Sequence, residues 1–569
     1  MKLIKNLHWL LYAFFLLACA RQSSPTGGPK DTIPPVLVRT IPPNEAVNFK
    51  AKEIELIFSE DVILNTPKEQ LIVTPTISKE YKIVYRKNSV ILTFDEPLQD
   101  STTYTFNFRE TVQDITEKNP VENLQLAYST GTYIDSLSIE GTVYNMLKGT
   151  FVKDATVALH VENDTFNIFE HAAVYFTKTD DEGKFKISHL KPDNYFLYVF
   201  EDKNRNLIVN SRSESYGYLR EHQYLLDNIK DVTVGLIRLD AGPLKLTSAR
   251  PYNTYFNIRT SKNLRTFKLI AADSSELIYT FGEDNANIRL YKTTERDSLQ
   301  IQFQAIDSLG NMIDTTLYAK HLTREVTPEE FNVSVQSPSL MGHNGNFEAQ
   351  LTFTKPLKEF NLDSIYFKVD SLTQVNFTKE DLTWEPLNRT LKIARKFDKA
   401  LFAKPDGNGQ PMGRRATPAP ATAEPATKKQ PLLNELYLGL GAFISIEEDS
   451  SQKVVQSIKP AYSEDLSIIN IEIQTDEKNF IVELVDKTFK VIRQVKNQRK
   501  VKFEDIVPGD YQIRLIIDQN ANGRWDGGNY FKNVEPEKVI YYESADGSTT
   551  IKGVKANWDV GAGEMFITY

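Results

Sequence analysis

The stretch Glu53-Ile54-Glu55-Leu56-Ile57-Phe58 sets the fold class of this chain. Its apolar and polar residues alternate, so Ile54, Leu56 and Phe58 share one face of a strand. The segments 89–94 and 103–108 alternate in the same way. Such short runs recur along the chain with turn residues between them, and they predict an all-β protein of tandem β-sandwich domains. For short pieces such as 328–331 we expect single helical turns.

Composition narrows the classes of protein to which this chain belongs. Its length of 569 residues allows roughly four domains, and 41% hydrophobic residues are enough for several cores. The formal net charge of −8 disfavours a nucleic-acid partner, which would require a concentrated basic face. With a single cysteine, the chain forms no internal disulfide, so its stability must come from apolar cores.

That cysteine, Cys19, ends the sequence Leu16-Leu17-Ala18-Cys19. Two lysines and a short apolar run precede it, which predicts a secretory signal peptide over residues 1–18. The run is shorter than the about 20 apolar residues that a membrane-spanning helix needs. Leu-Leu-Ala-Cys resembles the lipobox of bacterial lipoproteins. The resemblance implies cleavage before Cys19 and diacylation of its thiol, which would attach the chain to a membrane through lipid. The alternative is an ordinary signal peptide with an incidental cysteine.

Residues 19–33 are rich in Ser, Gly and Pro and predict a flexible tether. Residues 34–132 then carry an ordered set of motifs: Pro34-Pro35, Pro42-Pro43-Asn44, the strand at 54–58 with its acidic continuation, 98–106, and Tyr128-Ser129-Thr130-Gly131. This order resembles the SbsA-type bacterial Ig-like domain of S-layer and envelope proteins. The resemblance implies a β-sandwich without catalytic activity.

An internal repeat marks two further domains. Residues 190–202 and 506–518 align without a gap from Pro192 and Pro508 onward. Both segments resemble the carboxypeptidase-regulatory, or transthyretin-like, β-sandwich, which is a non-catalytic module in other proteins. The resemblance covers 136–239 and 465–569. In the second copy, alternation predicts that Tyr511, Ile513, Leu515 and Ile517 face a core.

The sequence between the two copies of the repeat predicts two more β-sandwiches. Residues 243–322 contain alternating strands and a hairpin signal at 308–311. Residues 332–462 contain an alternating strand pattern followed by a proline, and this pattern is similar to one in the first Ig-like domain. The segment 403–431 interrupts this last domain with Pro, Ala, Thr, Gly and Lys, and we expect it to be a disordered insert because it has little apolar surface to bury.

A candidate calcium loop follows the repeat in its C-terminal copy. Asp518, Asn520, Asn522, Gly523 and Asp526 occupy positions 1, 3, 5, 6 and 9 of an oxygen-rich loop of the kind that calcium prefers. Position 12 is Asn529, where an EF-hand loop has Glu, and the flanks predict strand and turn rather than helices. The alternative is a hairpin loop whose Asx side chains satisfy their own backbone.

The N-terminal copy repeats this pattern with fewer charges. Asp202, Asn204, Asn206 and Asn210 stand at positions 1, 3, 5 and 9, and Leu207 replaces the glycine. No cofactor is required by the sequence, and calcium is the one candidate ion.

Eight triplets consist of Asp, then Ser or Thr, then Ile, Leu or Thr, and they begin at Asp31, Asp100, Asp135, Asp297, Asp307, Asp314, Asp363 and Asp370. They resemble the O-glycosylation sequon of some envelope glycoproteins. The alternative is that these triplets form turns that lead into strands, because Asp, Ser and Thr side chains hydrogen-bond to the backbone of such turns.

The order of lipobox, Ig-like domain and transthyretin-like modules resembles a family of Gram-negative envelope lipoproteins. It implies a non-enzymatic spacer, adaptor or binding protein at the outer membrane, on its periplasmic or cell-surface side, with an envelope protein or a glycan as partner. One alternative is a calcium- or glycan-dependent adhesin that stacks sugars on Trp525. Another is a hydrolase with an unrecognised site, although His-Glu-x-x-His, Gly-x-Ser-x-Gly and phosphate-loop motifs are absent from the sequence.

Overall fold

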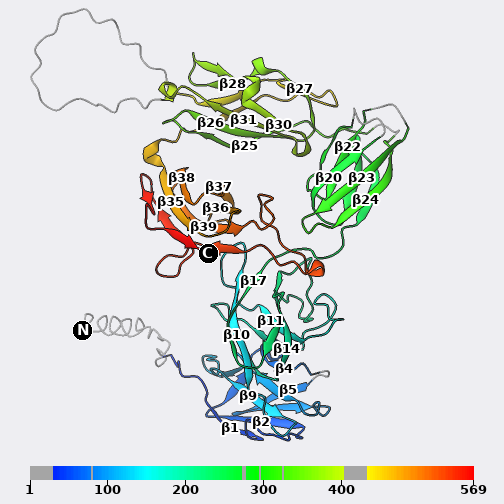
Figure 1. Ribbon diagram of the computed structural model, residues 1–569, viewed down its shortest axis with the longest axis vertical. Helices are drawn as coiled ribbons and strands as arrows, with labels where there is room; N and C mark the ends of the chain where they lie inside the picture. The colour runs from blue at the N-terminus through cyan, green and yellow to red at the C-terminus, as the bar shows by residue number, and fades with distance from the viewer. Residues whose placement is uncertain (1–29, 78–80, 272–276, 294–296, 323–325, 403–431) are drawn as a thin grey trace, which may run out of the picture. The chain divides into compact units, whose positions relative to one another are not determined.

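The protein, seen in a computed structural model, is described over residues 30–77, 81–271, 277–293, 297–322, 326–402 and 432–569. The signal peptide, Cys19, most of the tether and the insert 403–431 lie outside these residues. Strands make up nearly all of the regular structure (Figure 1). The remaining elements are α2 (Pro67–Gln70) and the 3₁₀ turns η2 (Leu362–Ser364), η3 (Lys379–Asp381), η4 (Pro386–Asn388), η5 (Lys399–Phe402), η6 (Ser463–Asp465) and η7 (Tyr530–Lys532).

The all-β prediction is therefore confirmed, and the single turn expected at 328–331 is wrong. That segment has no helical structure. Its Glu329 side chain instead accepts hydrogen bonds from Tyr255 at 3.2 Å and Arg289 at 2.8 Å, and these contacts with distant residues take the place of a local turn. The chain divides into two compact units. The first comprises the described residues up to Val143 together with Lys153–Ile208 and Glu221–Val234, and the second comprises Tyr144–Val152, Val209–Arg220 and Gly235–Tyr569.

The first sandwich lies within the first unit. Its sheets are β1 (Leu37–Ile41), β2 (Glu53–Phe58), β6 (Ser89–Phe94) and β5 (Tyr81–Arg86) in that order, β4 (Ile72–Thr74), β7 (Thr103–Asn107) and β9 (Gln125–Ser129), and the pair β3 (Val62–Leu64) and β8 (Val112–Asp114). Ile54, Leu56 and Phe58 are buried in one core with Phe106 and Leu126 of the facing sheet. The alternation of β2 thus predicted its buried face correctly.

The second sandwich has one sheet of β13 (Lys184–Leu190), β10 (Leu137–Asn145) and β17 (Ile229–Leu236). Its other sheet contains β12 (Tyr175–Lys178), β11 (Thr156–Val161) and β14 (Asp193–Phe200), with β16 (Gln223–Leu225) paired to β14. A Cβ atom at Gly141 would lie 1.9 Å from the carbonyl oxygen of Val232, so the close approach of β10 to β17 requires glycine. The strand β15 (Tyr216–Tyr218) belongs to the second unit.

The third sandwich pairs β18 (Leu246–Tyr252), β19 (Tyr255–Thr260), β22 (Asn287–Tyr291) and β21 (Tyr279–Phe281) with β20 (Leu264–Ile270), β23 (Leu299–Asp307) and β24 (Met312–Ala319). The turn expected at 308–311 joins β23 to β24 as an antiparallel hairpin. Gly310 takes a φ of +74° there, a conformation that glycine adopts without strain.

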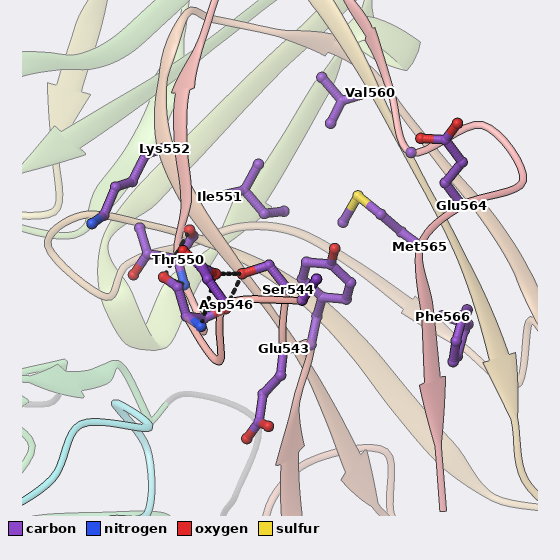
Figure 2. A pocket seen from close by; sticks show the side chains of 14 residues that line it. Glu543, Ser544, Asp546, Thr550, Ile551, Lys552, Val560, Glu564, Met565 and Phe566 are labelled. Carbon is purple, nitrogen blue, oxygen red and sulfur yellow. Dashed lines mark hydrogen bonds between the residues drawn. The ribbon is translucent and has the colours of Figure 1, made fainter.

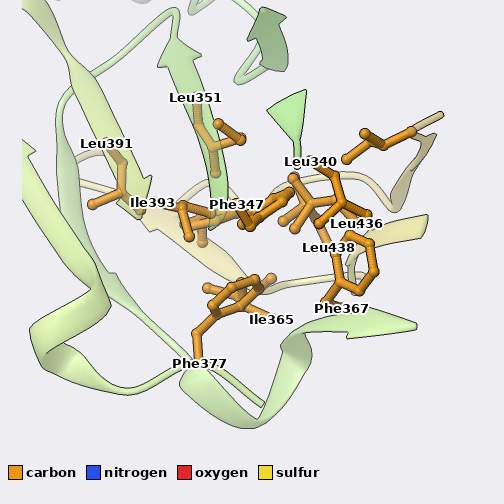
Figure 3. Packing of buried hydrophobic residues seen from close by; sticks show 14 of the residues in the cluster. Leu340, Phe347, Leu351, Ile365, Phe367, Phe377, Leu391, Ile393, Leu436 and Leu438 are labelled. Atoms are coloured by element: carbon orange, nitrogen blue, oxygen red, sulfur yellow. The ribbon is translucent and has the colours of Figure 1, made fainter. Parts of the chain in front are cut away.

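The fourth sandwich has one sheet of β25 (Val333–Leu340), β26 (Asn346–Phe353), β31 (Thr390–Lys396) and β30 (Leu382–Glu385). The facing sheet is β29 (Gln374–Asn376), β28 (Ile365–Lys368), β32 (Glu435–Leu438) and β34 (Val454–Ser457), and β27 (Leu357–Phe360) pairs with β33 (Phe443–Ser445). Figure 3 shows Phe347 and Leu351 of β26 among side chains from both sheets, including Ile365 and Leu436. This interdigitation closes the core.

The C-terminal sandwich has one sheet of β38 (Lys500–Ile506) and β35 (Ser467–Gln474), with β42 (Asp559–Val560) and β43 (Phe566–Thr568) both parallel to β35. The other sheet contains β37 (Val491–Lys496), β36 (Phe480–Asp486) and β39 (Gly509–Ile517), with β40 (Val539–Tyr541) and β41 (Ile551–Val554) paired to β39. Tyr511, Ile513, Leu515 and Ile517 are buried in its core, as their alternation predicted.

Replacing Leu351 tests the fourth core. Leu351→Ala removes a fully buried side chain, and we expect the free energy of opening this sandwich to fall by about 3 kcal/mol through lost burial and the cavity left behind. Amide hydrogen exchange in β26 and β31 of the full chain measures the change. The neighbouring Gln350→Ala variant alters an exposed side chain and should change the free energy of opening by less than about 0.5 kcal/mol. Equal effects of the two variants would contradict the assigned inward face.

Candidate functional site

The C-terminal Asx loop begins where β39 ends, at Asp518. One carboxylate oxygen of Asp518 accepts a hydrogen bond from the backbone N–H of Asn522 at 3.0 Å, and the other accepts from Gly523 at 2.7 Å. The side chain of Asn520 accepts from the same N–H of Asn522 at 3.1 Å. Gly523 has a φ of +77°. Asp518 thus organises the first turn of the loop by pairing its backbone donors.

Two further carboxylates lie beside this turn. Asp526 accepts hydrogen bonds from the side-chain amides of Asn520, at 2.7 Å, and Asn522. Glu537, which is 4% exposed, accepts from the backbone N–H groups of Gln519 and Asp526, each at 2.9 Å. Burial raises the pKa of Glu537, and the charges of Asp526 and Asp518 raise it further. The sequence pattern missed Glu537 because it follows Asp526 outside the 12-residue frame.

The N-terminal loop makes the same hydrogen bonds with different residues. Asp202 accepts from the backbone N–H groups of Asn206 and Leu207, both at 3.1 Å, as Asp518 does from Asn522 and Gly523. Asn204 accepts from the N–H of Asn206 at 3.2 Å. Leu207 takes a φ of 57°, in the left-handed region that Gly523 occupies in the other copy. The conserved feature of the repeat is therefore a turn geometry.

These bonds are those of the self-satisfied hairpin alternative. Asn529, at position 12, accepts from the backbone N–H of Lys532 at 3.2 Å and so caps η7. Within the part of the chain that the structure describes, no three His, Cys, Asp or Glu side chains are grouped as metal ligands. The geometry therefore favours the hairpin alternative, and calcium binding at Asp518, Asn520, Asn522 and Asp526, or at Asp202, Asn204 and Asn206, stays the competing, untested hypothesis.

Trp525 is half-buried rather than displayed. Its indole N–H donates to the carbonyl of Glu537 at 2.9 Å, and its ring packs against a small core cluster that contains Ile516 and Val539. A tryptophan held in this way completes the packing of its own sandwich. The adhesin alternative, which needs Trp525 as a stacking platform for sugars, gains no support from this position.

The C-terminal sandwich has a cavity of about 670 Å³ between the segment 542–552 and the segment 560–566 (Figure 2). Ile551, Val560 and Met565 give it an apolar wall, and Figure 2 shows the hydrogen bond that the Ser544 hydroxyl donates to Asp546 among its polar lining residues. The Ser544 hydroxyl and the backbone N–H of Ser548 lower the pKa of Asp546, which therefore stays ionised.

This cavity does not present the groups of a hydrolase. A serine nucleophile needs a nearby base with a pKa near the working pH, which is most often histidine. The carboxylate of Asp546 is a weak base, and no histidine is among the described residues that line the cavity. A mixture of an apolar wall and a few polar groups is instead typical of a concave binding pocket.

All eight Asp-Ser/Thr triplets lie in described residues. Asp307 and Asp370 each accept two backbone N–H bonds in a turn, from Leu309 and Asn311 at 2.9 and 2.8 Å and from Leu372 and Thr373 at 2.8 Å. These two triplets therefore form the side-chain-to-backbone turns that were the alternative to glycosylation. The hydroxyl residues are exposed at Thr32, Ser101, Ser136, Ser298, Ser308 and Ser371 and half-buried at Thr315 and Ser364. Glycosylation stays a prediction for hydroxyl groups that solvent reaches.

The first sandwich matches a known family. Residues 31–130 match the family model of the bacterial Ig-like domain. The first sandwich is a bacterial Ig-like domain, as its motifs predicted. None of the curated proteins compared with the chain matches it. No helix among the described residues has the length and apolar character to cross a membrane.

Solved structures with similar segments include a pilin, an S-layer protein and a third bacterial protein. BcpA, the major pilin subunit of Bacillus cereus, is 11% identical over 76% of this chain and 97% of its own, with a TM-score of 0.10. The S-layer protein rSbsC(31-844) is 9% identical over 90% and 67%, with a TM-score of 0.13. The Bacillus anthracis TIE protein is 8% identical over 96% and 75%, with a TM-score of 0.11. Values this low do not show a common arrangement of domains.

The Asx loop of the C-terminal copy is open to a direct test. Asp518→Ala leaves the N–H groups of Asn522 and Gly523 without their acceptor, and we expect it to destabilise the sandwich by about 1–3 kcal/mol. The exposed carboxylate of Asp476 in the same sandwich provides the control variant Asp476→Ala. Calorimetry of the full chain measures both.

The same measurement decides the role of calcium. Because the loop is closed by its own hydrogen bonds, we expect the unfolding temperature to be the same in calcium and in chelator. A rise in calcium that Asp518→Ala abolishes would instead establish the ion site.

Proposed function

We propose that this chain is a lipid-anchored, non-catalytic envelope protein that presents tandem β-sandwiches at the outer membrane as a spacer or adaptor. The observation that carries the proposal is the order of parts. A bacterial Ig-like domain begins at residue 31, shortly after the lipobox cysteine Cys19, and further sandwiches follow it to the C-terminus.

The cores support a role in which the sandwiches act as rigid spacers rather than as catalysts. Separate clusters of buried residues fill the first, third, fourth and C-terminal sandwiches. Their side chains are mainly aliphatic and aromatic, which gives close-packed interiors of low compressibility. Modules of this kind keep their shape while their surfaces are free to meet a partner.

The partner in this proposal is an envelope protein or a glycan. A surface of low net charge, −8 over 569 residues, fits a neutral or mixed-charge partner better than a polyanion. The cavity beside Met565 offers an apolar wall for such a contact. Chemical cross-linking in intact envelopes, followed by denaturing purification of the tagged full chain, would identify the proteins that it touches.

Metabolic labelling with palmitate tests the anchor. We expect the wild-type chain to take up label and to fractionate with the outer membrane, because acylated Cys19 would hold it there. Cys19→Ser should lose the label and release the folded chain from the membrane fraction. The nearby Ser24→Ala variant should behave as wild type. An unlabelled wild-type chain recovered from the cytoplasm would overturn the proposal.

A further inference from the structure

Lys355 is buried in the fourth sandwich, although lysine is rarely buried in full. It lies in the short link from β26 to β27, directly before Pro356, and only 1% of its surface is exposed. Its Nζ atom lies 2.5 Å from a carboxylate oxygen of Asp449 and 2.6 Å from one of Glu447. Two acids thus converge on one buried amine.

The loop that carries both acids is fixed in place. The backbone N–H of Ser445 donates to the carbonyl of Asp449 at 2.9 Å, and the hydroxyl of Ser445 lies 3.1 Å from the same Asp449 oxygen that meets Lys355. The N–H of Ile446 donates to the carbonyl of Pro356 at 3.1 Å, which ties the loop to the lysine segment. The amine and the carboxyl group are therefore held together by the backbone as well as by their charges.

The charges of this cluster do not balance. Burial alone would lower the pKa of Lys355, but the hydrogen bonds and charges of Asp449 and Glu447 raise it, so the ammonium form is the resting state. One ammonium faces two carboxylates, and a desolvated ammonium such as that of Lys355 is costly even when it is paired. Conversion of one pair into a neutral group would remove that cost.

We infer that Lys355 and Asp449 condense into an intramolecular amide bond and that Glu447 carries the protons. Glu447 takes one proton from the Lys355 ammonium and delivers it to the Asp449 carboxylate. The neutral amine then attacks the carboxyl carbon of Asp449, and a new C–N bond forms.

Collapse of the tetrahedral intermediate gives the amide and releases water. Glu447 moves a second proton from the nitrogen to the departing hydroxyl group, the C–O bond breaks, and one water molecule leaves. The products are one amide, one water and an unchanged Glu447 carboxylate, so no oxidant or further reactant is needed. Proximity drives the step, since well-oriented intramolecular groups reach effective molarities of about 10⁵–10⁸ M. Asp449 is 37% exposed on its side chain, which gives the water a path to solvent.

A second lysine, whose side chain is 11% exposed, supplies an internal comparison. Lys262 lies 2.7 Å from Asp307 in the third sandwich, but its Nζ also donates to the backbone carbonyls of Asp240 and Gly242. Asp307 is held by Asn311, and no second carboxylate within the described structure is paired with Lys262. This pair lacks the proton carrier, so we expect it to remain an ion pair.

Intact-mass spectrometry of the denatured full chain tests the inference. The wild-type protein should be lighter by one water molecule than the mass calculated for its processed, acylated chain. Trypsin should release the peptide that ends at Lys358 joined to the peptide that ends at Lys453, which distinguishes the cross-link from loss of water at an isolated aspartate. A loss of two waters, with Lys262 joined to Asp307, would contradict the role given to Glu447.

Variants assign the roles. Lys355→Arg and Glu447→Gln should restore the full mass and abolish the joined peptides. Glu448→Gln changes the neighbouring exposed carboxylate, which pairs with Lys358, and should leave the bond intact. Asp449→Asn keeps the shape of the site and should lose ammonia in place of water. A wild-type chain of full mass without joined peptides overturns the inference, whether or not any variant folds.

Discussion

Burial of apolar faces between paired sheets is the interaction on which the whole structure depends. The chain has one cysteine, and that residue lies before the first domain, so no sulfur bridge supports any sandwich. Each domain must therefore close its own core. The 32 phenylalanines and 26 tyrosines serve this need, because an aromatic side chain buries a large area at the cost of few rotatable bonds. Phe347, Phe367 and Phe397 of the fourth core, with centroids 5.0–5.5 Å apart, illustrate the result.

Polar side chains play the complementary part at the ends of the strands. Asp202 and Asp518 lie just after the ends of their strands. Their carboxylates accept hydrogen bonds from backbone N–H groups of the following loops, which lie outside the sheets. The two loops have the same bonds although one uses Leu207 where the other uses Gly523. A left-handed leucine is strained, so the turn is imposed by the hydrogen bonds and the packing around it rather than by local preference.

Local pattern predicted much of this fold. The period of two identified β2, and the alternation at Tyr511 to Ile517 identified the inner face of β39, because both features depend on neighbours in sequence. The parallel pairing of β42 and β43 with β35 escaped prediction, since such short strands have no periodicity to detect. Glu537 and the Lys355 cluster escaped for a related reason: they form by contact between distant segments, and Lys355 and Asp449 are 94 residues apart in sequence.

The position of Lys355 is informative because an apolar residue would fill the same space without a charge to compensate. A buried charged cluster adds little stability over apolar packing, so its presence suggests a function beyond packing. A covalent link between residues 355 and 449 would close a long loop that includes 403–431, and closing long loops restricts the unfolded chain most. In a protein without disulfides, such an amide would give one sandwich a covalent restraint that does not depend on the redox state of its surroundings.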